Sequence, residues 1–100
     1  MPETLILEFS GVTEADYASI NGHLGIDMHT GEGDWPPGLF SHTAGVGDDG
    51  TFIVTEVWNS RADQAAFLEG RLGAALAAGG VTTLPAVRWV PLIAYHTPGA

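Results

Sequence analysis

The fold is decided by residues 38–79, which read GLFSHTAGVGDDGTFIVTEVWNSRADQAAFLEGRLGAALAAG. Two runs in this stretch, Leu39–Ala44 and Thr51–Trp58, are rich in apolar, aromatic and β-branched residues, and the segment Gly45–Gly50 between them is rich in glycine and aspartate. Such a pattern is typical of two antiparallel strands joined by a tight turn. The stretch therefore predicts a β-hairpin.

A helix is expected directly after the hairpin. Ser60 with Asp63 three residues later resembles a capping box, the pairing of side chains with backbone amides that starts many helices. Gly79-Gly80 supplies the stop, because glycine accepts the left-handed conformation that closes helices. Between them, apolar side chains recur at helical spacing at Ala65, Leu68, Leu72 and Leu76.

The segments before the hairpin predict a strand, a helix and a loop. Thr4–Phe9 is a short apolar run that is typical of a buried strand. Thr13 is placed as an N-cap with Asp16 three residues later, and Val12 is placed to pack against Tyr17. The helix that follows has an apolar stripe made of Tyr17, Ile20 and Leu24.

The segment Gly25–Gly38, which contains four glycines and two prolines, is expected to form a long loop. Long loops in small domains are often functional. After the second helix, Ala86–His96 predicts a last strand, in which Pro91 is tolerated best at a sheet edge or a bulge.

The predicted element order is βαββαβ in a single domain spanning residues 1–100. Two right-handed crossovers then give an antiparallel sheet of order 4-1-3-2 with both helices on one face, which is a ferredoxin-like α+β fold. The strands carry apolar side chains on both faces, as Leu5, Ile6 and Leu7 show for the first strand. Because two short helices cover only one face, we expect a homodimer that packs sheet to sheet.

Composition excludes several classes of function. The chain has 12 acidic residues against 3 arginines and a net charge of −9, which disfavours nucleic acid and anionic membranes as partners. It has no cysteine and no lysine, so disulfides, thiol chemistry and a side-chain Schiff base are excluded. Nothing at the N-terminus resembles a secretion signal, and a soluble, cytoplasmic protein is expected.

Four stretches carry a resemblance to a known superfamily: Pro36–Gly45, Asp49-Gly50, Val57–Arg61 and Phe67–Leu72. Together they resemble small proteins of the dimeric α+β barrel superfamily, and especially the antibiotic-biosynthesis-monooxygenase group, over roughly residues 4 to 95. The resemblance implies the dimeric barrel fold. It also implies an activity among those of the superfamily, which include cofactor-free oxygenases of polycyclic aromatic polyketides, isomerases, cyclases and haem-degrading enzymes. Catalytic residues vary among these branches, so none is carried over.

Four ionisable residues within the strands predict a site. If the first and third strands run parallel and the other two run against them, then Glu8, Arg88, Glu56 and His42 gather at one end of the sheet. The loop that carries His29 and Trp35 is expected to reach the same end. Ionisable groups in apolar surroundings beside a long loop favour a catalytic pocket. The alternative is a rim of salt bridges at the strand ends.

His42 is the best candidate for acid–base chemistry, because histidine titrates near neutral pH. A carboxylate would orient its ring, but whether Glu56 is placed to do so depends on the hairpin register. A three-residue turn puts His42 opposite Glu56, whereas a two-residue turn, Asp48-Asp49, puts it opposite Thr55.

Aromatic side chains are the candidates for holding a flat hydrophobic ligand, since ring compounds stack on them. The candidate ligand-binding residues are Trp58, Trp35, Phe40 and His29, although Trp58 also suits the role of a packing anchor between sheet and helix. Carboxylates and histidines of residues 23–34 match no metal-binding spacing, so we expect neither a metal nor another cofactor.

Two functions are compatible with these features. The first is a cofactor-independent monooxygenase or a cyclase/isomerase acting on a hydrophobic, polyketide-like molecule. In it His42 is the acid or base, Arg88 stabilises an oxyanion, and Glu56 and Glu8 set the histidine tautomer. The second is a non-catalytic dimeric module that binds a small ligand or is purely structural. A cleft with His42 and Arg88 pointing into it would favour the first function.

Overall fold

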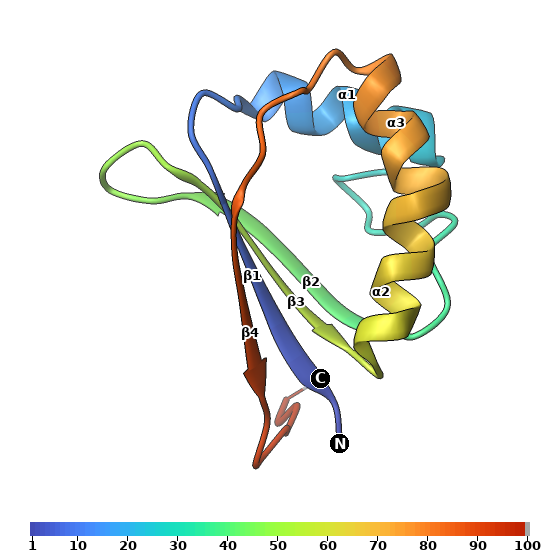
Figure 1. Cartoon of the computed structure of the whole chain (residues 1–100), viewed down its shortest axis with the longest axis vertical. Helices are drawn as coiled ribbons and strands as arrows, with labels where there is room; N and C mark the ends of the chain where they lie inside the picture. Colours follow the sequence, from blue (N-terminus) through green and yellow to red (C-terminus); the bar gives the residue numbers. More distant parts are fainter. Residues whose placement is uncertain (100) are drawn as a thin grey trace.

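The computed structural model describes residues 1–99 and consists of a twisted sheet with its helices on one side (Figure 1). The strands lie in the order β2-β3-β1-β4, which is the predicted 4-1-3-2 order of a ferredoxin-like α+β fold. The fold prediction is thus confirmed. Along the chain the elements are β1 (Glu3–Phe9), α1 (Glu14–Leu24), β2 (Leu39–Val46), β3 (Phe52–Trp58), α2 (Arg61–Phe67), η1 (Leu68–Leu72), α3 (Gly73–Ala78) and β4 (Ala86–Pro91).

Every pair of neighbouring strands is antiparallel, and this corrects the expected strand directions. β1 pairs with β3 from Glu3 opposite Trp58 to Phe9 opposite Phe52, so the first and third strands run in opposite directions. The crossover through α1 instead makes β1 parallel to β2, and the hairpin then reverses β3. As a result Glu56 lies opposite Leu5 near the start of β1, far along the strand from Glu8.

The hairpin turn holds three residues. Val46 pairs with Phe52, and the Gly47 amide donates to the Thr51 carbonyl at 2.8 Å, so Asp48–Gly50 form the turn. Gly50 has φ +85°, a left-handed conformation that glycine adopts without steric cost. Of the two registers left open by the sequence, the structure has the one that places His42 opposite Glu56.

Both helix starts follow the predicted capping pattern. The Thr13 amide donates to Asp16 Oδ2 at 3.0 Å and the Asp16 amide donates to Thr13 Oγ1 at 3.1 Å, which completes a capping box before α1. At α2 the Asp63 amide donates to Ser60 Oγ at 3.1 Å. These bonds satisfy backbone amides that the first helical turn would leave without partners.

The second helix is interrupted, although the apolar spacing predicted one continuous helix. A wider π-helical turn, η1, joins α2 to α3, and Gly70 within it has the non-helical angles φ −104° and ψ −106°. At Gly73 an added Cβ would lie 2.7 Å from the Leu68 carbonyl oxygen, so the tight approach there requires glycine. The helix ends as predicted, with Gly80 at φ +72° and the Val81 amide bonded to the Leu76 carbonyl at 3.0 Å.

The last strand is shorter than predicted, because it ends at Pro91 instead of His96. Pro91 lies beside Glu3 on an edge strand, where its missing amide hydrogen costs no bond, because the amide of the next residue is the one that points to β1. The Leu92 amide donates once more, to the Pro2 carbonyl at 3.2 Å, and the chain then leaves the sheet. Ile93 is 99% exposed as a result.

The two faces of the sheet differ in what covers them. The helix-facing side carries the buried side chains of Leu5, Phe52, Val54 and Trp58. The opposite side carries Ile6, Ile53 and Thr55, which are only partly buried, and the helices in Figure 1 all lie on the other side. The core therefore lies between the sheet and the helices.

Replacing Ser60 by alanine tests whether the cap stabilises the helix that covers this core. Ser60→Ala should lower the free energy of unfolding by about 1 kcal/mol, because it leaves the Asp63 amide without its partner. Urea unfolding followed by circular dichroism measures the change. Ser19→Ala, on an exposed position of α1, is the matched control and should not destabilise the protein; an equal loss in both variants would contradict the capping role.

Candidate functional site

A cavity of about 500 Å³ lies between the sheet and the helices. Most of its wall is apolar, and the aromatic residues Phe9, Trp35, Phe52, Phe67 and Trp89 contribute to it. The few polar groups on the wall include Tyr17, Asn21, His42 and Glu56. A mostly apolar cavity of this size with few polar groups is typical of a site for a small organic molecule.

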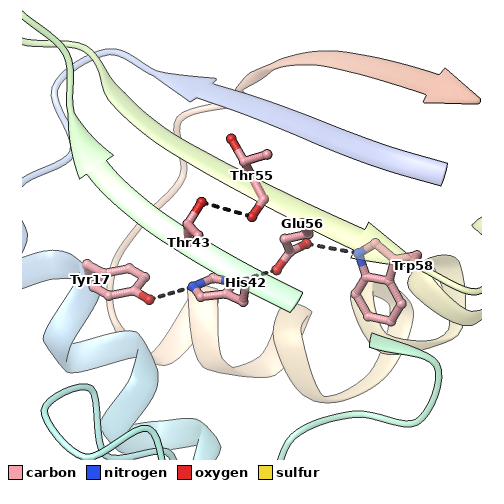
Figure 2. Close-up of polar contacts among 6 residues, drawn as sticks. All are labelled: Tyr17, His42, Thr43, Thr55, Glu56 and Trp58. Carbon is pink, nitrogen blue, oxygen red and sulfur yellow. Dashed lines mark hydrogen bonds and ion pairs between the residues drawn. The ribbon is translucent and has the colours of Figure 1, made fainter. Parts of the chain in front are cut away.

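Four polar side chains form a continuous hydrogen-bonded chain beside this cavity, which we call the relay (Figure 2). The Tyr17 hydroxyl lies 2.5 Å from His42 Nε2, and His42 Nδ1 lies 2.8 Å from Glu56 Oε2. The indole nitrogen of Trp58 donates to Glu56 Oε1 at 3.0 Å. The relay thus connects a phenol at the cavity wall to a carboxylate in the core.

The secondary structure places each member of the relay. His42 on β2 is paired with Glu56 on β3, and Trp58 follows Glu56 by two residues, so all three share the helix-facing side. Tyr17 reaches His42 from α1, with the two rings stacked 5.9 Å apart. Thr43 and Thr55 project from the other side of the same strands in Figure 2.

The hydrogen bonds define which atoms carry protons when Glu56 is ionised. Its two oxygens accept from the Trp58 N–H and from the His42 Nδ1–H. In the neutral imidazole His42 Nε2 then has a free lone pair, which accepts the Tyr17 O–H. Glu56 is only 8% exposed, and two donors are what a buried carboxylate requires. The arrangement therefore makes the phenol of Tyr17 the end of the relay opposite to Trp58.

The environment of Tyr17 favours its neutral form. Burial raises the pKa of the Tyr17 phenol above its usual value; the Asn21 side chain partly offsets this, and the negative charge of Glu56 raises the pKa further. At neutral pH the phenol keeps its proton and donates it to His42.

Asn21 is a buried polar residue with an unused donor. It lies one helical turn after Tyr17, is 4% exposed and lines the cavity. Within residues 1–99 its amide nitrogen Nδ2 has no hydrogen-bond partner. The sequence did not indicate Asn21 as a site residue. It indicated Tyr17 only as a member of the apolar stripe of the first helix. The signal that could have identified them is their spacing of four residues, which places both side chains on one face of a helix.

Glu8 and Arg88 do not join His42 and Glu56, and the predicted grouping of the four is wrong. Arg88 pairs with Ile6, and Glu8 pairs with Ala86, which places both on the side of the sheet away from the cavity. Both side chains are exposed, and within residues 1–99 they form no ion pair with each other. The prediction failed because it took the strands to run in the wrong relative directions.

Of the predicted ligand-binding residues, Trp35 lines the cavity, with its ring 5.3 Å from that of His42. Trp58 instead is fully buried behind Glu56 and packs on Phe67, as the alternative interpretation expected. Phe40 lies at a bulge, is 49% exposed and stacks on Tyr95 outside the cavity. His29 is exposed in a turn of the loop.

In the part of the chain that the structure describes, no three histidine, aspartate or glutamate side chains converge on one point. None of its helices has the length and apolar character needed to cross a bilayer. Asp27 in the loop accepts the amides of His29 and Thr30, which lowers the pKa of its carboxyl.

Comparison with known proteins identifies the fold. No protein-family model matches the sequence, and no curated protein matches it significantly. Similar solved structures include a candidate antibiotic biosynthesis monooxygenase from Chloroflexus aurantiacus, with 20% identity and a TM-score of 0.66 over 99% of this chain and 100% of that one. Rv0793 from Mycobacterium tuberculosis has 17% identity and a TM-score of 0.67 over 97% and 100% of the two chains.

A protein of unknown function from Nitrosomonas europaea is also similar, with 25% identity and a TM-score of 0.60 over 99% of this chain and 94% of that one. Each of these matches covers nearly the whole length of both chains. The protein therefore shares the fold of these solved structures, and the resemblance predicted from the sequence is confirmed at the level of the fold.

The raised pKa of Tyr17 predicts a pH-dependent stability. Because the unfolded chain loses this proton first, near the usual pKa of 10.0, the stabilisation is present below that pH and is lost as the pH rises towards the raised folded value. Tyr17→Phe should therefore show a smaller fall in the free energy of unfolding between about pH 9 and about pH 11. Urea unfolding across this range measures it. Tyr95→Phe is the control, and an identical fall in both variants would count against the burial of the Tyr17 phenol.

Proposed function

We propose that this protein is a cofactor-independent enzyme, a monooxygenase or a cyclase/isomerase, that withdraws a proton from a hydrophobic small molecule bound in the cavity. The observation that carries the proposal is the relay: a phenol, an imidazole and a carboxylate joined at 2.5 Å and 2.8 Å beside a cavity of about 500 Å³. A chain of hydrogen-bond donors and acceptors of this kind is suited to general base catalysis.

The proton path follows from the hydrogen bonds. A ligand O–H or acidic C–H beside the Tyr17 oxygen gives its proton to that oxygen, while the Tyr17 proton moves to His42 Nε2. The resulting imidazolium keeps its Nδ1–H on Glu56, whose negative charge stabilises the positive ring. When the peroxide or product anion forms, Tyr17 gives a proton to it and takes back its own proton from His42, which restores the relay. Trp58 is a positioning residue, because it holds Glu56 without reaching the cavity.

The ligand anion formed in this way can react without a bound cofactor. In the oxygenase case a CH₂ group flanked by unsaturated groups loses a proton, and its carbanion transfers two electrons to dioxygen to form a hydroperoxide. Loss of water then gives a ketone, so that R₂CH₂ and O₂ become R₂C=O and H₂O. In the isomerase or cyclase case the same anion is protonated at another carbon or attacks a carbonyl group within the ligand.

The apolar lining supports a hydrophobic ligand. Trp35 and Phe52 offer aromatic faces near the relay, and Tyr17 lies 5.3 Å from the Phe52 ring. Arg88 has no role in this proposal, because it lies on the other side of the sheet. The fold shared with a candidate antibiotic biosynthesis monooxygenase is compatible with the oxygenase form of the proposal.

The proposal includes a homodimer. The side of the sheet away from the helices carries Ile6, Ile53 and Val57 with no helix over it within the described chain. An apolar face of this kind is usually covered by another surface, and a second copy of the sheet is complementary in size and character. The cavity lies on the helix side, so each protomer of such a dimer would hold its own ligand.

The enzymatic proposal is tested with anthrone, a three-ring ketone with an acidic CH₂ group, as a probe. Wild-type protein should bind it and accelerate oxygen consumption, with anthraquinone and water as products. Tyr17→Phe, His42→Gln and Glu56→Gln should each lower kcat by about 100-fold or more, because each interrupts the proton path. An oxygen electrode together with product absorbance measures the rates.

His29→Ala is the matched control, because it removes an imidazole that lies outside the cavity and should leave kcat unchanged. Equal rates in Tyr17→Phe and wild type would contradict the proton path. Binding of anthrone and related ring ketones without any turnover would instead favour the alternative, a non-catalytic ligand-binding module.

The dimer is tested by light scattering at micromolar concentration. The expected mass is twice the 10.4 kDa of the single chain. Ile6→Lys should shift the mass towards one chain, because it puts a second positive charge beside Arg88 on the face that two copies would bury. Ser19→Lys, on exposed α1, is the control and should remain dimeric. A wild-type mass of one chain would refute the dimer.

A further inference from the structure

We infer that Asn21 binds a carbonyl oxygen of the ligand, so that the cavity selects molecules carrying a neutral hydrogen-bond acceptor next to the atom that Tyr17 deprotonates. This inference rests on the proposed function, and it adds a feature of the ligand that the relay alone does not define. Two properties of Asn21 carry it: the burial of an unused donor, and the position of that donor in the cavity.

The first property is the burial of an unused donor. Asn21 is only 4% exposed, and its Nδ2 has no hydrogen-bond partner among residues 1–99. A buried donor without a partner is unfavourable, and native proteins rarely retain one without a purpose. An apolar residue of similar size, such as leucine, would fill the same place on α1 without this penalty. The retained amide therefore indicates a partner that arrives with the ligand.

The second property is the position of the amide. Asn21 lines the same cavity as Tyr17 and His42, one helical turn along α1 from Tyr17. The amide is near enough to lower the pKa of the Tyr17 phenol, although no hydrogen bond of normal geometry joins the two. An oxygen bound to Nδ2 would therefore lie beside the Tyr17 hydroxyl, where the ligand proton is removed.

The charge of the surroundings decides what kind of oxygen this is. An amide N–H₂ group offers hydrogens only, so its partner must be an acceptor. An anionic ligand is disfavoured, because the Glu56 carboxylate lines the same cavity and the chain carries a net charge of −9. No arginine lines the cavity to neutralise a ligand anion. A neutral carbonyl oxygen on an apolar ring compound fits all these conditions.

The same hydrogen bond would assist the proton transfer. When a proton leaves a carbon or hydroxyl conjugated with a carbonyl group, the negative charge moves partly onto the carbonyl oxygen. A donor already aimed at that oxygen binds it more strongly as the charge develops. Asn21 would thus take the place that the sequence assigned to Arg88.

A matched pair of probes isolates this hydrogen bond: fluorenone and fluorene, which have the same ring frame and differ at one carbon, C=O against CH₂. Quenching of tryptophan fluorescence gives the dissociation constant of each probe for wild-type protein and for Asn21→Leu. The ratio of the fluorene constant to the fluorenone constant should fall by about 5- to 10-fold in Asn21→Leu, the value of one neutral hydrogen bond. The comparison of ratios removes the general difference in hydrophobicity between the probes.

Ser19→Leu, the same replacement on an exposed position of α1, should keep the wild-type ratio. Asn21→Ala also removes the donor and serves if leucine does not fit. An unchanged ratio in a folded Asn21 variant would overturn the assignment of Asn21 and leave the relay untouched. Failure of wild-type protein to bind either probe would overturn the proposed class of ligand and this inference together.

Discussion

The structure depends on how a buried carboxylate is held. Glu56 lies in the middle of β3 among apolar side chains, and an isolated negative charge there would be strongly unfavourable. Trp58 and His42 supply one donor to each of its oxygens, and both come from strand positions that the hairpin register brings to the same face. A shift of the register by one residue would turn His42 to the opposite side and leave Glu56 with one donor. The three-residue turn at Asp48–Gly50 therefore determines both the stability of this carboxylate and the existence of the site.

The architecture was predictable from sequence because its signals are local and consistent. Capping residues such as Thr13 and Ser60, the glycines of the hairpin and the apolar periodicity all indicate the same element order, and topology rules then allow few sheets. The errors were of two kinds. Backbone details such as the wide turn at Gly70 and the early strand end at Pro91 leave the apolar pattern almost unchanged. The direction of β3 relative to β1 is a long-range property, and the mistake there placed Glu8 and Arg88 wrongly.

The candidate site was predictable only where it depends on the hairpin. His42 and Glu56 lie on the two strands of one hairpin, for which the sequence allowed two registers. The structure has the register that places them opposite each other. Tyr17 and Asn21 come from a helix that packs over the sheet, and no pattern within the chain reports which side chains meet across that interface. Trp58 illustrates the same limit, since a tryptophan after a strand suits a ligand-binding cleft and a core position equally well.

The wide turn between α2 and α3 has a consequence for how the chain tolerates deletions over evolutionary time. A π-type turn holds one residue more than an α-helical turn, and each residue of an α-helix advances the chain by about 100° around the axis. Losing one residue within Leu68–Leu72 would therefore convert the wide turn into an ordinary α-helical turn and keep the inward-facing side chains of α3 in place. A single-codon deletion at this seam is thus absorbed within the turn, while the cavity, the sheet and its buried carboxylate stay as they are.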